Sequence, residues 1–357
     1  MRRGRGLATA LLAHLGTTAA GFRLPTASAG SLGAALRGAA GAFEAAGVPE
    51  PRLSAQHLLT RAAGFGSSRG RLDAQLDTPL EPSARARFEA MCAQRLERVP
   101  VQYILGDWDF HDLTLQVRAP VLIPRPETEQ LVEMVLDAHA GGPGGRDRPL
   151  RLLDVGCGSG AIGLALLQQL PNARCVAIDL SAEAVALATE NARLCGLDAR
   201  FTAILVPDGI EGFARAAPGA SADCDADTDG GGDGGDGSER FDVVVSNPPY
   251  IPAADMAGLA PEVREHEDRQ ALCGGADGAD VVRLVLRAAP RLLRARGPRA
   301  VWLEVDPSHP ALLRKWLEPP ATASDAGAAM PMRLVQVHDD LNGLERFCHV
   351  ELDDVCE

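Results

Sequence analysis

The chain has 357 residues, which is enough for two domains of ordinary size, and its hydrophobic content of 46% excludes a wholly disordered protein. It has no run of the roughly 18 apolar residues that a membrane-spanning helix needs. The formal net charge of −13 argues against a broad basic surface that binds nucleic acid non-specifically. The eight cysteines form no C-x-x-C pair and no zinc-type cluster, which is typical of a reducing compartment.

The N-terminus is rich in arginine. The first 43 residues contain five arginines and no acidic residue before Glu44. This composition, with Ala, Leu, Ser and Thr between the arginines, is typical of an organellar presequence. We therefore expect residues 1–30 to be an organellar presequence. The alternative is a disordered N-terminus on a cytoplasmic protein.

Residues 31–100 are expected to form a small helical domain. Helical patterns such as 53–63 and 83–97 are separated by glycines and prolines, which end helices. In residues 101–128 the pattern changes to a linker of short strands that leads into the sequence Pro124-Arg125-Pro126-Glu127-Thr128-Glu129. The residues that mark these short strands are Tyr103, Trp108, Phe110, Leu113, Leu115 and Val117.

From residue 129 to residue 357 strands and helices alternate, which predicts a mostly parallel sheet with helices on both faces. The predicted strands are 150–155, 174–178, 241–245 and 300–305, and the predicted helices are 129–138, 161–170, 182–195 and 279–293. Residues 332–337 and 347–350 are expected to add an antiparallel pair. Residues 218–240 hold seven acids and seven glycines. They predict a disordered insertion, because a calcium loop would need a bidentate glutamate that is absent.

A glycine-rich loop stands between the first of these strands and the helix that follows it. The loop consists of Gly156, Cys157, Gly158, Ser159 and Gly160. Glycines there let the backbone turn tightly and approach a ligand at the N-terminus of the helix. Asp179, at the end of the next strand, can accept hydrogen bonds from ribose hydroxyls. The spacing from Asp154 is similar to the S-adenosylmethionine loop of class I methyltransferases, but Gly158-x-Gly160-x-x-Gly163 also fits a dinucleotide site and so leaves a NAD-dependent oxidoreductase open.

The sequence Asn247-Pro248-Pro249-Tyr250 follows an apolar strand and predicts a clamp for a planar NH2 group. Amide nitrogen is a poor nucleophile because its lone pair is delocalised, so an enzyme that methylates it must hold it towards the methyl donor. The Asn247 oxygen and the Pro248 carbonyl can each accept one N–H, and Tyr250 can stack on the amide plane. The prolines fix φ, so proximity supplies most of the rate. An adenine-N6 DNA or RNA methyltransferase could use the same clamp on a flipped base.

Three motifs together, residues 124–129, the glycine loop and Asn247–Tyr250, resemble the HemK/PrmC-type N(5)-glutamine methyltransferases of peptide chain release factors. Residues 303–309, with the arginine-rich N-terminus, resemble the mitochondrial branch, and the resemblance covers roughly residues 31–350. It implies that residues 1–30 are a mitochondrial transit peptide and that the protein works in the mitochondrial matrix. It implies the α/β fold class: a class I, Rossmann-like, seven-stranded S-adenosylmethionine-dependent methyltransferase domain behind a helical domain that binds the release factor. It also implies methyl transfer to the glutamine of the Gly-Gly-Gln motif of class I release factors, in support of translation termination.

The resemblance further implies roles for single residues. The glycine loop, Asp179 and Asn247 would bind S-adenosylmethionine, and Asn247–Tyr250 would bind the substrate, with Asn247, Pro248 and Tyr250 catalytic. Many members carry an acid near the adenine after the third strand, and Asp208, displaced by one position, is the candidate here. We expect release factors as partners of a monomer without metal, nucleic acid or membrane. Methylation of a ribosomal-protein glutamine and a non-catalytic release-factor-binding protein are the further alternatives.

Overall fold

The computed structural model describes residues 21–24, 30–140, 144–216, 240–318 and 330–353. The chain divides into two compact units, Met1–Gly106 and Asp107–Glu357. Apart from residues 21–24, residue 30 and Arg240, the expected transit peptide and the expected insertion 218–240 lie outside the described residues. Within the described ranges no helix is both long and apolar enough to cross a membrane.

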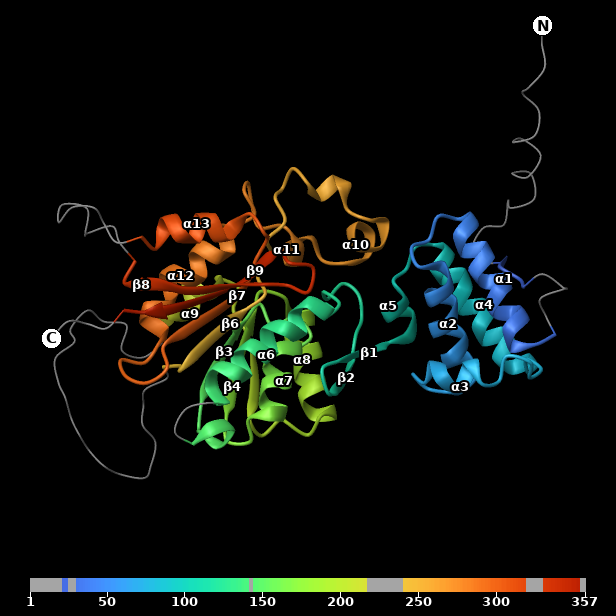
Figure 1. Cartoon of the computed structure of the whole chain (residues 1–357), viewed down its shortest axis with the longest axis horizontal. Helices are drawn as coiled ribbons and strands as arrows, with labels where there is room; N and C mark the ends of the chain where they lie inside the picture. The colour runs from blue at the N-terminus through green and yellow to red at the C-terminus, as the bar shows by residue number, and fades with distance from the viewer. Residues whose placement is uncertain (1–20, 25–29, 141–143, 217–239, 319–329, 354–357) are drawn as a thin grey trace, which may run out of the picture. The chain divides into compact units, whose positions relative to one another are not determined.

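The first unit is helical (Figure 1, blue to teal). Its helices are α1 (Leu32–Ala45), α2 (Pro51–Ala62), α3 (Arg69–Asp73), α4 (Pro82–Leu96) and α5 (Val101–Leu105). The Ser31 side chain caps α1 by accepting the Ala34 N–H, and a proline begins α2 and α4. Helix α2 packs against both α1 and α4. The large side chains that are fully buried in this unit include Phe43, Leu58 and Phe88.

Helix α5 corrects one prediction from the sequence. Tyr103 was expected in a strand, but it lies within this single helical turn, which ends at Gly106. Gly106 has φ of 82°, a left-handed conformation that is common just after a helix. The Arg61 guanidinium of α2 donates to the Leu105 carbonyl at 3.1 Å. A contact with a distant helix therefore supports α5, and no local pattern in the sequence records that contact.

The second unit is built around a mixed sheet. Among the described residues the sheet has seven strands in the order β5-β4-β3-β6-β7-β9-β8, and β9 points in the direction opposite to the other six. The strands are β3 (Arg151–Val155), β4 (Arg174–Asp179), β5 (Phe201–Leu205), β6 (Val243–Ser246), β7 (Ala300–Glu304), β8 (Met332–Asp339) and β9 (Glu345–Leu352). A separate hairpin pairs β1 (Asp107–Phe110) with β2 (Leu113–Gln116). The predicted α/β class, with a parallel sheet and a closing antiparallel pair, is confirmed.

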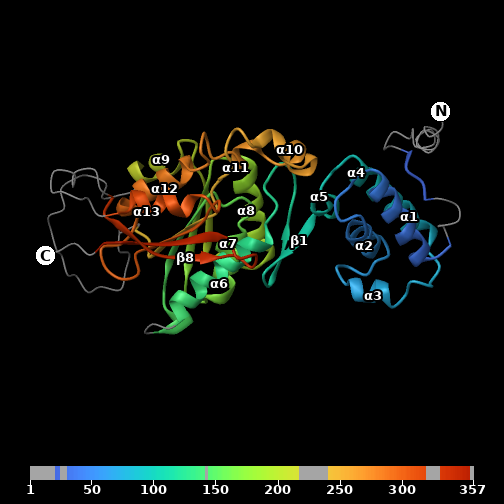
Figure 2. The same ribbon diagram turned by 45° about the horizontal axis from the view of Figure 1, so that its top comes forward.

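Helices cover both faces of this sheet (Figures 1 and 2). One face carries α6 (Pro126–Ala140), α7 (Ala161–Gln169) and α8 (Ala182–Leu194), and the other carries α9 (Gly209–Ala216), α12 (Asp280–Leu292) and α13 (His309–Trp316). Strands β6 and β7 are buried along their whole length, which explains why each is apolar up to its last residue, Ser246 or Glu304. The remaining short helices are η4 (Gly145–Asp147), η5 (Met256–Gly258), α10 (Pro261–His266) and α11 (Arg269–Leu272).

The strand order reverses at β3, which has β4 on one side and β6 on the other. In open α/β sheets, ligands bind in the crevice outside the carboxyl ends of the strands at such a reversal. The glycine loop follows β3, Asp179 ends β4, and Asn247 follows β6. The topology therefore brings the three predicted site segments to one edge of the sheet.

Candidate active site

A cavity of about 600 Å³ lies at this edge of the sheet. Its size is within the range of sites that bind cofactors and other small molecules. The predicted site residues that line it are Gly156, Gly158, Asp179, Asn247 and Pro249. Those that are not among its lining residues are Cys157, Ser159, Gly160, Asp208, Pro248 and Tyr250. The rest of the wall is mostly apolar and includes Leu122, Ile178, Val206, Ile210 and Leu284.

Gly156 and Gly158 present bare main chain to the cavity. Their φ angles are 72° and 53°, which L-residues rarely adopt. A Cβ atom at Gly156 would meet no atom within 4 Å. The side chains of Cys157 and Ser159 are instead buried, with exposed fractions of 6% and 3%. Alternate residues of the loop thus face the ligand space and the interior of the fold.

Asp179 joins the end of β4 to the glycine loop. Its Oδ2 atom accepts the Gly158 N–H at 2.9 Å, and its Oδ1 atom accepts the Ser181 N–H at 2.9 Å. Burial raises the pKa of Asp179, while the hydrogen bonds from Ser181 and Gly158 act in the opposite direction. Each carboxylate oxygen keeps a second lone pair. Asp179 can therefore also accept hydroxyl groups of a ligand in the cavity.

Asp208, by contrast, is exposed. Its neighbours Val206 and Gly209 line the cavity, but Asp208 does not. The Asp208 side chain lies against α9, where a Cβ atom at Gly212 would come 2.5 Å from the Asp208 Cβ. Its position in the sequence alone suggested Asp208 as a cofactor-binding residue. In the structure its side chain is not part of the cavity wall.

Asp154 lies behind the glycine loop and is fully buried. Its Oδ2 atom accepts the Gly163 N–H at 3.0 Å, which joins β3 to α7, and its Oδ1 atom has no hydrogen-bond partner within the described ranges. Burial is the main cause that raises the pKa of Asp154 to about 7, and the nearby Asp179 raises it further against the effect of the Gly163 bond. The carboxyl group that closes β3 therefore supports the loop from inside the fold.

Asn247 is held by side chains from two other elements. Its Nδ2 atom donates to Thr128 Oγ1 at 3.0 Å, and the Thr128 hydroxyl donates to Glu304 Oε2 at 2.7 Å. The Tyr250 hydroxyl donates to the other oxygen of Glu304 at 3.3 Å. Burial raises the pKa of Glu304, and burial together with the nearby Glu304 carboxylate raises the pKa of Tyr250 well above its ordinary value. The sequence motifs contain Thr128 and Glu304, but sequence reasoning assigned neither of them a role.

A loop of residues 274–279 packs directly on the main chain that follows Asn247. A Cβ atom at Gly274 would come 2.5 Å from the Pro249 carbonyl oxygen, and one at Gly278 would overlap the Tyr250 carbonyl oxygen. The Gly274 N–H also donates to the Ile251 carbonyl at 2.9 Å. Glycine is required here because two main chains lie closer together than any side chain allows.

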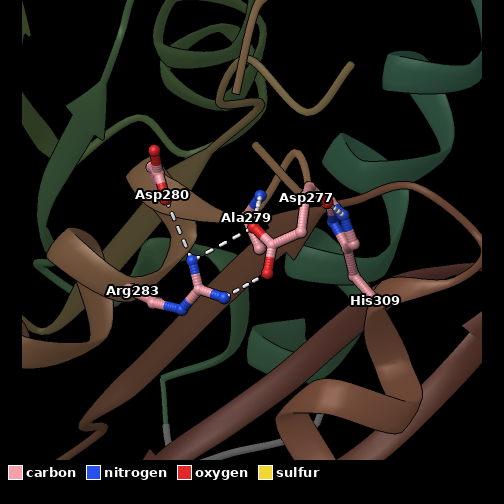
Figure 3. Close-up of polar contacts among 5 residues, drawn as sticks. All are labelled: Asp277, Ala279, Asp280, Arg283 and His309. Atoms are coloured by element: carbon pink, nitrogen blue, oxygen red, sulfur yellow. Dashed lines mark hydrogen bonds and ion pairs between the residues drawn. The ribbon is translucent and has the colours of Figure 1, made fainter. Parts of the chain in front are cut away.

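The same loop is fixed from its other side (Figure 3). The Asp277 carbonyl oxygen lies 3.0 Å from Nε2 of the buried His309. The Asp277 carboxylate accepts the Ala279 N–H at 3.2 Å and pairs with Arg283, which also bonds Asp280 at 3.0 Å. The hydrogen bonds from Arg283 and Ala279 lower the pKa of Asp277 to about 2. Residues 274–279 thus form a rigid support behind the Asn247–Tyr250 segment.

Arg125 connects the 124–129 motif to the cavity wall. It donates to both oxygens of Glu267, at 2.8 Å and 2.6 Å, and only 1% of the Glu267 side chain is exposed. Burial raises the pKa of Glu267, and Arg125 opposes that rise. The residues after Glu267 line the cavity, and the first of them, Asp268, donates its N–H to the Pro120 carbonyl at 2.8 Å. Two residues of the motif therefore support the cavity: Thr128 bonds to Asn247, and Arg125 pairs with Glu267 just before the lining residues.

Comparison with known proteins covers both units of the chain. Residues 34–106 match the family described as PrmC N-terminal domain, and residues 147–207 match a methyltransferase domain family. The chain is 39% identical to the MTRF1L release factor glutamine methyltransferase of Homo sapiens over 87% of this chain and 84% of the relative. It is 40% identical to the release factor glutamine methyltransferase of Geobacter sulfurreducens over 73% of this chain and 78% of the relative.

Solved structures show lower similarity. The catalytic domain of hMettl16, in complex with the MAT2A 3′UTR hairpin 6, is 14% identical with a TM-score of 0.46 over 75% of this chain and 82% of that chain. The ribosomal protein L11 methylase of Lactobacillus delbrueckii subsp. bulgaricus is 17% identical with a TM-score of 0.36 over 65% of this chain and 82% of that chain.

Proposed function

The chain belongs to the release factor glutamine methyltransferases, and on that premise we propose that it methylates the side-chain amide nitrogen of the Gly-Gly-Gln glutamine in class I peptide chain release factors. It is an S-adenosylmethionine-dependent methyltransferase of class I fold, as its matched domain and its sheet indicate. The reaction breaks the bond between the methyl group and the sulfonium sulfur of the cofactor, forms a bond from that methyl group to the amide nitrogen, and releases one amide proton and the neutral thioether. The product would support translation termination.

The residues at the sheet edge fit S-adenosylmethionine, which supplies an electrophilic methyl group when it is bound. Gly156 and Gly158 leave open space beside the main chain, and the carboxylate of Asp179 faces the same cavity. In this proposal the loop 156–160 holds the amino-acid part of the cofactor and Asp179 accepts the ribose hydroxyls. Apolar side chains of the wall, such as Ile210, would cover the adenine. We propose no contact for the exposed Asp208.

The substrate clamp requires two acceptors on one side of the amide. Asn247 lines the cavity and follows a strand that is buried along its length, so its position is rigid. In the proposed mechanism Asn247 Oδ1 and the Pro248 carbonyl each accept one amide N–H, which turns the nitrogen lone pair towards the methyl donor. In the same proposal Tyr250 would stack on the amide plane, and its hydroxyl donates to Glu304. Placement of the amide, rather than a strong base, supplies the rate.

The observation that carries this proposal is that Asn247 lines the same cavity as the glycine loop and Asp179, while a hydrogen bond from its Nδ2 atom to Thr128 holds its carboxamide. An adenine base could also offer two N–H groups to Asn247. The family and the charge of −13 favour a protein substrate. The experiment below therefore includes a nucleic acid.

The test uses methyl-labelled S-adenosylmethionine with three substrates: a release factor, the same factor with its Gly-Gly-Gln glutamine changed to alanine, and duplex DNA. We expect label only on the intact factor. Asn247→Ala should abolish labelling. Asn172→Ala changes an exposed asparagine that is not part of the proposed site, and it should leave labelling unchanged. Label on DNA, or label that survives the glutamine change, would contradict the proposal.

Three further proposals concern partner binding, oligomeric state and location. We propose that the helical unit, which the sequence predicts as residues 31–100, binds the release factor. We also propose that the enzyme works as a monomer. Deletion of that unit should raise KM for the factor, and sedimentation should give a mass near 37.4 kDa for the full chain. We also propose a mitochondrial matrix enzyme. Residues 1–43 fused to a reporter should carry it into mitochondria, and a diffuse cytosolic signal would contradict this.

A further inference from the structure

The proposed methyl transfer requires one particular orientation of the Asn247 carboxamide. The two ends of a carboxamide have similar size, but only the oxygen accepts hydrogen bonds and only the nitrogen donates them. If Nδ2 faced the substrate amide, two donors would oppose each other. Some feature of the fold must therefore select the rotational state that offers Oδ1.

A chain of hydrogen bonds leads from Asn247 into the interior. Asn247 Nδ2 contacts Thr128 Oγ1 at 3.0 Å, and Thr128 Oγ1 contacts Glu304 Oε2 at 2.7 Å. Thr128 lies in the first turn of α6, and Glu304 is the last residue of β7. Their exposed fractions are only 4% and 1%. Water therefore has little access to these bonds, and the partners must satisfy one another.

Glu304 fixes the donor and acceptor direction of every hydrogen bond between it and Asn247. The Thr128 hydroxyl donates its single proton to Glu304 Oε2 at 2.7 Å, and the ionised form of Glu304 has no proton to donate in return. Thr128 then has only lone pairs left to offer Asn247. The carboxamide of Asn247 must turn its NH2 end to Thr128, which leaves Oδ1 as its acceptor for a ligand in the cavity.

We propose, on the basis of the proposed function, that Thr128 and Glu304 are positioning residues that set the orientation of the Asn247 carboxamide and so present Oδ1 to the substrate amide. The second oxygen of Glu304 accepts the Tyr250 hydroxyl. One buried carboxylate thus orients two members of the clamp. A buried carboxylate is costly for a fold, and both oxygens of this one are used on side chains that lead to the clamp.

The first test needs no substrate. In ¹⁵N-labelled protein, the side-chain NH2 signals of Asn247 are identified by their loss in Asn247→Ser. We expect one of these protons to exchange with solvent at least roughly tenfold more slowly in the wild type and in Thr128→Ser than in Thr128→Val. The NH2 signals of the exposed Asn172 should be the same in all variants. Equal exchange of the Asn247 protons in all three proteins would overturn the proposal.

The second test measures the reaction with a release factor. Thr128→Val, which keeps the branched shape, should lower kcat about 100-fold, while Thr128→Ser should stay within about threefold and the Kd for S-adenosylmethionine within about twofold of the wild type. Glu304→Gln, which keeps the volume, should lower kcat as Thr128→Val does. The double variant should lose no more than the worse single variant, because both changes act through one chain of bonds.

Several outcomes of the second test would overturn the proposal. These are a kcat of Thr128→Ser as low as that of Thr128→Val, an unchanged kcat in a folded Thr128→Val, and additive losses in the double variant. If Thr128→Val does not fold, Glu304→Gln carries both measurements. A wild type with a protected Asn247 proton that leaves the release factor unlabelled would refute the proposed function and not the positioning role.

Discussion

The carboxylate of Asp179 accepts the main-chain N–H of Gly158 at 2.9 Å, which joins the end of β4 to the middle of the glycine loop. A second N–H, from Ser181, is bound to the other oxygen. Both bonds exist within the chain itself, so the acid and the loop hold their relative position before a cofactor arrives. Such preorganisation reduces the conformational entropy that binding costs.

Asp179→Ala should weaken cofactor binding, because the variant loses both a ligand for the ribose and the anchor of the glycine loop. We expect the Kd for S-adenosylmethionine to rise by about 10- to 100-fold, the usual effect of losing a hydrogen bond to a charged group. Asp208→Ala is the matched control, since that acid is exposed and outside the cavity lining. Calorimetric titration measures both. A larger loss in Asp208→Ala than in Asp179→Ala would contradict the assignment.

Arg125→Ala should destabilise the fold, because it leaves the buried carboxylate of Glu267 without its cation. Breaking one side of a buried pair typically costs about 3 kcal/mol of unfolding free energy. Arg118→Ala removes an arginine from the exposed pair with Glu190 and should change stability little. Urea unfolding of the three proteins measures the difference. Equal stability of the two variants would show that the Arg125–Glu267 pair stabilises the fold no more than the exposed pair does.

Gly274→Ala should disrupt the Asn247–Tyr250 segment, because its Cβ atom would come 2.5 Å from the Pro249 carbonyl oxygen. One of the two main chains must move, and we expect kcat to fall by about 100-fold. Gly41→Ala, in α1 with open space around the new Cβ, should instead raise stability by up to about 1 kcal/mol. Steady-state kinetics and thermal unfolding compare the two. Full activity in Gly274→Ala would mean that the loop yields without moving the clamp.

The buried Asp154 should make stability fall as pH rises. Its pKa is about 7 in the folded chain and near the ordinary aspartate value of 3.8 when unfolded. Between these values the folded state binds more protons, so the free energy of unfolding decreases with pH, by up to roughly 4 kcal/mol. Asp154→Asn should lack this contribution. Urea unfolding at pH values between about 4 and 8 measures the free energy of unfolding of both proteins. As pH rises, the value for the wild type should fall relative to the value for the variant. A difference that is constant with pH would contradict a raised pKa.

Much of the site could be predicted because its parts are local in sequence. Gly156 and Gly158 stand between a strand and a helix, and Asp179 ends the next strand, so a reader of the chain can place them at one sheet edge. Asn247 follows the same rule. The alternation of strands and helices likewise predicted the sheet, because buried parallel strands are uniformly apolar. Tyr103 was placed wrongly, because the contact that supports α5 comes from a distant helix.

From the sequence alone one could derive the fold class and expect the glycine loop, Asp179 and Asn247 at one edge of the sheet. The packing of the elements was needed to show which of these residues line the cavity, and it leaves Asp208 exposed and outside the lining. It alone joined Thr128 to Glu304, which are 176 positions apart, and both of them to Asn247. The physical reason is that helix and strand patterns record which face of an element is buried, whereas a hydrogen bond between two elements depends on how they pack. No periodicity in the chain encodes that packing.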